Sequence, residues 1–116
     1  MKAGPVADAV LLDHMLQCVE RIREYTRNER DTFMASALVQ DAVMRKLHTL
    51  TESSQRLSAA VKEATPEVAW RELAGFRNVI VHGYLGVDLD ATWLVVEHDL
   101  PPLESALRRL GGSADG

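Results

Sequence analysis

The strongest constraint on the fold is the spacing of the apolar residues, which recur at steps of three and four over most of the chain. The first such stripe reads Leu11, Met15, Cys18, Ile22 and Tyr25. This spacing matches the ~3.6 residues of a helical turn, whereas a half-buried strand alternates every second residue. We therefore expect an amphipathic helix from about Val6 to Tyr25.

A second apolar stripe follows the polar stretch Asn28–Asp31, and either Asp31 or Thr32 is a suitable N-cap for its helix. The stripe consists of Leu38, Ala42, Val43, Leu47, Leu50, Leu57 and Val61. An unbroken helix over residues 32–64 would be about 50 Å long, which is long for so small a domain. We therefore expect this helix to bend or to begin later, near Ser36.

Proline and glycine divide the second half of the chain into shorter helices. Thr65-Pro66-Glu67 predicts a helix start, with the threonine as cap and the proline in the first turn. Asp88 is a suitable cap for a helix that follows residues 76–84. Pro101-Pro102 predicts the entry of a last helix, which Gly111 would end, so that residues 111–116 form a frayed tail.

The composition agrees with a helical fold. Of the 116 residues, 47% are hydrophobic but only 5% are aromatic, and the apolar mass is leucine, valine and alanine. Val79–Val81 and Trp93–Val96 are short enough to be strands, but helical pattern flanks both. We expect a single domain over residues 1–116: an all-α, compact, up-and-down bundle of about four to six helices.

Charge and cysteine content bound the surroundings of the protein. A single cysteine, Cys18, cannot form an internal disulfide, and no run approaches the ~20 apolar residues of a membrane span. We expect a cytoplasmic protein with no membrane partner. The formal net charge of −4 argues against broad nucleic-acid binding, so no DNA partner is predicted, although a local basic cleft remains compatible with it.

The stretch from Phe76 to Tyr84 departs from the usual pattern of a solvated polar face. Arg77 is always charged and can fork onto a phosphate. His82 is the type of side chain most easily used as a base near neutral pH, and Tyr84 carries a hydroxyl that can be modified. We take this stretch as the candidate site.

The spacing within this stretch does not by itself make a site. Arg77 and His82 are five residues apart, which places them about 140° apart around a regular helix. Asn78 and His82 are four apart and share a face. For Arg77 and His82 to act together, the helix must kink near Gly75, unwind at Gly83, or meet a second copy across a two-fold axis. An ordinary amphipathic helix with a capping histidine and a surface arginine remains the alternative.

The order of these residues resembles the signature of the HEPN domain superfamily, in which a histidine follows an arginine after a short spacer. Here the signature reads Arg77-Asn78, three apolar residues and His82. Tyr84, two residues beyond, makes the stretch similar to the HepT-like toxins of two-gene HepT–MntA toxin–antitoxin modules. The likeness extends over nearly the whole chain, through Tyr25, Pro66, Trp70, Asp88, Trp93 and Asp99-Leu100-Pro101.

The resemblance implies a helical bundle that forms a homodimer and acts as a metal-independent endoribonuclease toxin of a type VII-like module. By that likeness, His82 would serve as base or acid, Arg77 would stabilise charge on the phosphate, and Asn78 would orient His82 or the phosphate. Tyr84 would accept AMP from the partner, an MntA-like minimal nucleotidyltransferase antitoxin. The added bulk and negative charge would block the RNA cleft.

Other readings of the sequence remain open. The chain could be a non-catalytic helical module that docks a nucleotidyltransferase or a nucleotide, or a plain dimerisation bundle. His14 and Cys18 are four apart and could begin a metal site, but no second pair follows, so no metal or other cofactor is predicted. Asp88 and Asp90 have the two-carboxylate spacing of nucleotidyltransferases, but the Gly-Ser element that those enzymes need is missing.

Overall fold

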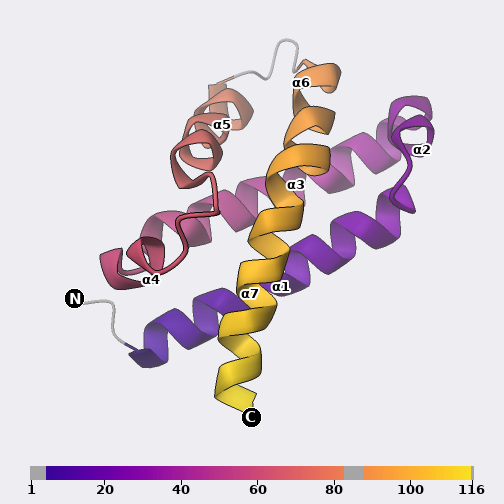
Figure 1. The fold of residues 1–116 in the computed structure, drawn as a ribbon. Helices are drawn as coiled ribbons and strands as arrows, with labels where there is room; N and C mark the ends of the chain where they lie inside the picture. Colours follow the sequence, from indigo (N-terminus) through magenta and orange to yellow (C-terminus); the bar gives the residue numbers. More distant parts are fainter. Residues whose placement is uncertain (1–4, 83–87, 116) are drawn as a thin grey trace.

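The chain forms an all-helical bundle in its computed structural model, which describes residues 5–82 and 88–115 (Figure 1). Its elements are α1 (Pro5–Thr26), α2 (Arg30–Ala35), α3 (Ala37–Arg56), α4 (Ala59–Glu63), α5 (Trp70–His82), α6 (Leu89–Leu94), η1 (Val95–Asp99) and α7 (Leu100–Asp115). Within these residues there is no strand, and α6, η1 and α7 join into one continuous helical run. The expected all-α bundle is therefore confirmed. No described helix is long and apolar enough to cross a membrane.

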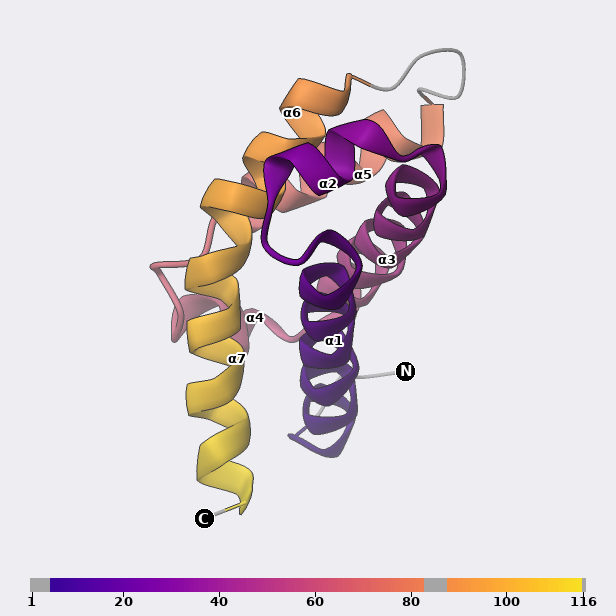
Figure 2. The same cartoon turned by 90° about the vertical axis from the view of Figure 1, so that its right-hand side faces the viewer.

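The core lies where α3 and α7 pack against α1, and α5 packs against the other side of α3 (Figures 1 and 2). The apolar face predicted for the first helix is confirmed, because its residues from Leu11 to Ile22 are buried and Tyr25 is half-buried. On α3, Val43, Leu47 and Leu50 are buried as the second stripe predicts. The same core also includes residues of the other helices, among them Met15, Val19, Phe33, Leu73, Leu100, Leu103 and Leu107.

Leu38 is an exception to the predicted stripe, since 80% of it is exposed. It lies in the first turn of α3, directly after the break that separates α3 from α2. That break is at Ser36, whose hydroxyl accepts a hydrogen bond from the Val39 N–H at 3.2 Å and caps α3. The expectation that the long helix begins near Ser36 is confirmed.

The expected cap at Asp31 or Thr32 is wrong, because both residues lie inside α2. Arg27 and Asn28 take positive φ angles of 55° and 59°, which end α1 in a left-handed turn. The chain therefore turns earlier than the polar composition suggests, and α2 begins at Arg30. Asp31 and Thr32 have side chains that commonly cap helices, so residue type alone could not show that α2 begins before them.

The second helix also ends earlier than expected, at Arg56, and Ser58 caps the separate helix α4. Thr65 does not cap the following helix, which is a further correction, since α5 begins only at Trp70. The Thr65 hydroxyl instead donates to the Val61 carbonyl at 2.8 Å and accepts the Trp70 indole N–H at 3.0 Å. Thr65 thus closes α4 and anchors the start of α5.

The helical run from α6 to α7 contains a π-helical segment, η1, directly before Pro101-Pro102. The prolines lack N–H donors, and in a regular α-helix their rings would collide with the carbonyls four residues back. The α-helical pattern of hydrogen bonds to the fourth preceding residue is therefore interrupted here. The Leu100 N–H bonds to the Val95 carbonyl five residues back, which widens the helix at this point.

The two ends of this helical run differ in how well the sequence predicts them. Asp88 caps α6 as predicted, accepting from the Ala91 N–H at 3.1 Å. Gly111 does not end the last helix, because α7 runs to Asp115.

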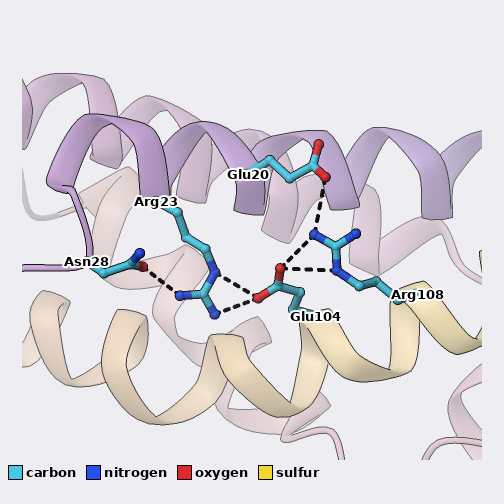
Figure 3. A network of polar contacts seen from close by, with 5 residues as sticks. All are labelled: Glu20, Arg23, Asn28, Glu104 and Arg108. Carbon is cyan, nitrogen blue, oxygen red and sulfur yellow. Dashed lines mark hydrogen bonds and ion pairs between the residues drawn. The ribbon is translucent and has the colours of Figure 1, made fainter.

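A polar network joins α1 to α7 on one side of the bundle (Figure 3). The Glu104 carboxylate accepts from Arg23 at 2.7 Å and from Arg108 at 2.9 Å. Arg108 also reaches Glu20 at 3.2 Å, and Arg23 donates to the Asn28 side-chain oxygen at 2.6 Å. Glu104 is the shared acceptor of both arginines, so the network depends on its charge.

Glu104→Gln is expected to destabilise the fold by about 1–2 kcal/mol at neutral pH. Burial by itself would raise the pKa of the Glu104 carboxyl, but the hydrogen bonds from Arg108 and Arg23 outweigh it and leave the pKa lowered. The stabilisation is therefore present above the unfolded pKa and is lost as pH falls through the lower folded pKa.

Urea unfolding of wild type and variant checks this prediction at neutral pH and at a pH below the usual glutamate value of about 4.3. The difference in the free energy of unfolding should shrink in acid. The control is Glu24→Gln, which removes an exposed pair with Arg21 and should change stability by less than about 0.5 kcal/mol. A Glu104→Gln effect that is the same at both pH values contradicts the explanation.

Candidate functional site

The candidate stretch begins on a well-anchored helix. Leu73 and Phe76 of α5 are buried in the core, and α5 packs along α3. At the first residue of α5, the Trp70 ring is tied to Thr65 and has the Lys62 ammonium over it, 6.0 Å from the ring centroid. The N-terminal half of α5 therefore holds the backbone of its C-terminal half in a defined place.

Three of the four predicted site residues lie on the C-terminal half of α5. Arg77, Asn78 and His82 all belong to this helix, and His82 is its last residue. The structure describes their backbone only. Tyr84 lies outside the described residues.

Helix α5 shows no break at Gly75, so a kink there does not bring Arg77 and His82 together. Gly75 lies within the helix and does not take a positive φ. A Cβ built on Gly75 would meet nothing within 4 Å, so packing does not demand a glycine there either. On this continuous helix, Arg77 and His82 remain about 140° apart around the axis, whereas Asn78 and His82 share a face.

The sequence did not predict that Glu72, in the first turn of α5, and Asp99, at the end of η1, would lie near each other. Burial, and then the negative charge of Glu72, raise the pKa of the Asp99 carboxyl, while nearby His98 acts in the opposite sense. Asp99 is the last residue of η1, and a π-helical turn shifts the register of the residues that follow. A regular helical period therefore could not place Asp99 near α5.

The remaining candidates have structural surroundings. Burial raises the pKa of the Cys18 thiol, although Lys46 acts in the opposite sense, so Cys18 stays protonated and is a poor metal ligand. His14, four residues away, is exposed. Across residues 5–82 and 88–115, no three histidine, cysteine or acidic side chains gather as a metal site would require. Asp88 is the α6 cap, which accounts for its position without a nucleotidyltransferase site.

The fold and the site together define a small all-α protein that carries an arginine, an asparagine and a histidine on the last turns of one helix. Residues 15–110 match the profile of the family described as "HepT-like: Ribonuclease HepT-like". The chain therefore belongs to the HepT-like family. No solved structure matches the chain.

Named relatives share similarity over most of the chain. A protein of Thermococcus cleftensis named "Probable ribonuclease HepT" is 33% identical over 85% of this chain and 91% of its own length. A Methanocaldococcus jannaschii protein, whose name pairs a gamma-glutamylcyclotransferase with a provisional RNase assignment, is 34% identical over 87% of this chain. The alignment covers 46% of that longer relative. A second protein of that organism, provisionally named an RNase, is 29% identical over 78% of the chain.

Proposed function

We propose that this chain, as a single HEPN domain, is the toxin of a type VII-like toxin–antitoxin module and cleaves RNA without a metal ion. The observation that carries the proposal is the position of Arg77, Asn78 and His82 at the end of an anchored helix in a HepT-like chain. The names of the relatives support the choice of RNA as substrate.

The proposed chemistry needs only side chains of this chain. His82 takes the proton of a ribose 2′-hydroxyl, whose oxygen attacks the adjacent phosphorus, or it protonates the 5′ oxygen that leaves. The bond from phosphorus to the 5′ oxygen breaks, which gives a 2′,3′-cyclic phosphate and a 5′-hydroxyl. Arg77 stabilises the charge that develops on the phosphate, and Asn78 orients His82 or the phosphate.

Two copies of the chain form the proposed cleft. Because α5 continues through Gly75, and Gly83 lies outside the described residues, we take a two-fold axis as the way to face one copy's Arg77 toward the other copy's His82. Arg45 and Lys46 lie on α3, the helix that packs on α5, and neither side chain has an ion pair within the described residues. These two cations offer local attraction for RNA on a chain of net charge −4.

Tyr84 is the proposed point of control. Incubation with ATP and a cognate MntA-like nucleotidyltransferase is expected to raise the intact mass by whole AMP groups, and Tyr84→Phe should remove that gain. Intact-mass spectrometry checks this prediction, with Tyr25→Phe on α1 as the control that should still be modified. Equal modification of Tyr84→Phe contradicts the assignment.

A non-catalytic module that docks a nucleotidyltransferase or a nucleotide is the second candidate function. The acidic net charge favours it, because ribonucleases usually need a basic surface. The discriminating experiment incubates the purified chain with RNA in EDTA and analyses the product ends. Turnover that yields 2′,3′-cyclic phosphates supports the ribonuclease. Nucleotide or partner binding without RNA turnover, unchanged by Arg77→Ala and His82→Ala, supports the binding module.

A further inference from the structure

A cavity of about 780 Å³ opens between α1, α4 and α7. Its apolar lining comes mainly from Leu12 and Leu16 of α1, Val61 of α4, and Leu107 and Leu110 of α7. This volume falls in the range of about 300–1,000 Å³ that is usual for small-molecule sites, which are also mostly apolar with a few polar groups.

The α1 wall of the cavity carries a buried carboxylate, Asp8, that has no cationic partner among the described residues. Asp8 is 8% exposed and lines the cavity. Its two oxygens accept the Ser58 N–H at 3.0 Å and the Ser58 hydroxyl at 2.7 Å, and both donors are neutral. Among the residues that the structure describes, no cation forms an ion pair with Asp8. Buried charges are ordinarily paired, so Asp8 is unusual in this respect.

The other charged residues of the lining do not neutralise Asp8. Asp13, which is exposed, adds a second carboxylate, and this carboxylate accepts a hydrogen bond from the Gln17 amide at 2.9 Å. Arg108 also lines the cavity, but it is held by Glu20 and Glu104 on the side toward the network of Figure 3. The cavity thus combines apolar walls with excess negative charge on its α1 side.

The cavity lies away from the candidate site. The first turns of α1, the helix α4 and the last turns of α7 are at one end of the bundle, and the C-terminus of α5 is at the other (Figures 1 and 2). A molecule bound in the cavity would therefore leave the end of α5 accessible.

We propose that this cavity binds a small amphipathic cation, an apolar molecule that carries one ammonium group. The lining on α1 runs from Asp8 to Leu16, about 12 Å along the helix axis, which is the length of a medium alkyl chain rather than of a protein segment. The apolar body lies on the leucines, and the ammonium group lies at Asp8, where it supplies the missing positive charge, while Asp13 adds negative potential at the exposed edge of the same wall.

Titration calorimetry with three probes of equal chain length tests the proposal. Octylammonium is expected to bind saturably and about tenfold more tightly than octanol, because the ammonium forms a charge-assisted contact that the alcohol cannot. Octanoate should bind more weakly than octanol, since its charge has the sign of Asp8 and Asp13. Asp8→Asn and Asp13→Asn should each reduce the preference for octylammonium over octanol, and Asp13→Asn changes only an exposed residue.

A matched pair of blocking variants locates the site. Ala60 and Ala59 are exposed neighbours on α4, but only Ala60 lines the cavity. Ala60→Trp should abolish octylammonium binding, and Ala59→Trp should leave it unchanged. The proposal is overturned if octylammonium does not bind saturably, if it binds no better than octanol, or if Ala60→Trp has no effect.

Discussion

RNA cleavage is expected to fall by about 10²–10⁴-fold when either Arg77 or His82 is replaced by alanine. The His82 variant loses the proposed proton transfer, and the Arg77 variant loses the charge that stabilises the transition state. Because both groups act in one step, the double variant should be little worse than either single one. Initial rates on a defined RNA in EDTA, with enzyme in excess, check this prediction.

The controls for this prediction use exposed residues of the same types outside the proposed site. Arg71→Ala removes an exposed arginine from the first turn of α5, and His98→Ala removes an exposed histidine from η1. Both are expected to keep most of the wild-type rate. Circular dichroism and thermal melting show whether each variant is folded. If folded Arg77→Ala and His82→Ala cut as fast as wild type, the proposed site is wrong.

The largest effect on stability is expected for Trp93→Ala, about 3–5 kcal/mol. Trp93 is 5% exposed and stacks on the fully buried Phe33 of α2, with ring centroids 5.5 Å apart and an interplanar angle of 30°. Removing the indole leaves a large void between α2 and α6. Since domains are stable by only about 5–15 kcal/mol, the loss is a large part of the total.

Trp93→Phe is the informative companion of Trp93→Ala. The Trp93 indole nitrogen is buried and has no hydrogen-bond partner in the described part of the chain, so phenylalanine keeps an aromatic ring and gives up no hydrogen bond seen there. We expect it to retain at least half of the stability that alanine loses. Leu94→Ala, which truncates a residue 53% exposed on the same helix, should change stability by less than about 0.5 kcal/mol.

Urea unfolding of the three variants measures these differences. A Trp93→Ala value within about 1 kcal/mol of wild type contradicts the packing explanation. A Trp93→Phe variant as unstable as Trp93→Ala would show that a single six-membered ring does not replace the packing of the indole on Phe33.

The elements that the sequence predicts correctly are those set by local chemistry. The spacing from Leu11 to Tyr25 marks the buried face of α1, because helical period and burial coincide there. Ser36 and Asp88 cap α3 and α6, since a short polar side chain can bond to the N–H three residues on in either context. These features require no knowledge of the tertiary structure.

The elements that the sequence misplaces depend on long-range contacts. Thr65 has the right residue type for a cap, but its hydroxyl is engaged by Val61 and Trp70. The break after α3 is held by Asp8, which lies fifty residues before Ser58 in the chain. The register shift in η1 follows from two prolines acting together, which a regular period cannot represent.

The candidate site also combines features that the sequence predicts with features that depend on the folded chain or its assembly. Residue types and order point to Arg77, Asn78, His82 and Tyr84, and the likeness to a family gives them roles. Whether Gly75 kinks the helix was open in the sequence, and the structure shows α5 continuing through it. The number of chains that build the cleft is a property of an assembly, so it remains part of the proposal.

Mixing inactive variants tests the central claim, that Arg77 of one chain acts with His82 of another, most directly. Arg77→Ala and His82→Ala are unfolded together, refolded at equal amounts and assayed on RNA in EDTA. If each cleft combines residues of both chains, mixed dimers regain one intact site, and random pairing restores about a quarter of the wild-type rate. If each chain uses its own Arg77 and His82, the mixture stays as inactive as its parts, and the two-chain site is contradicted.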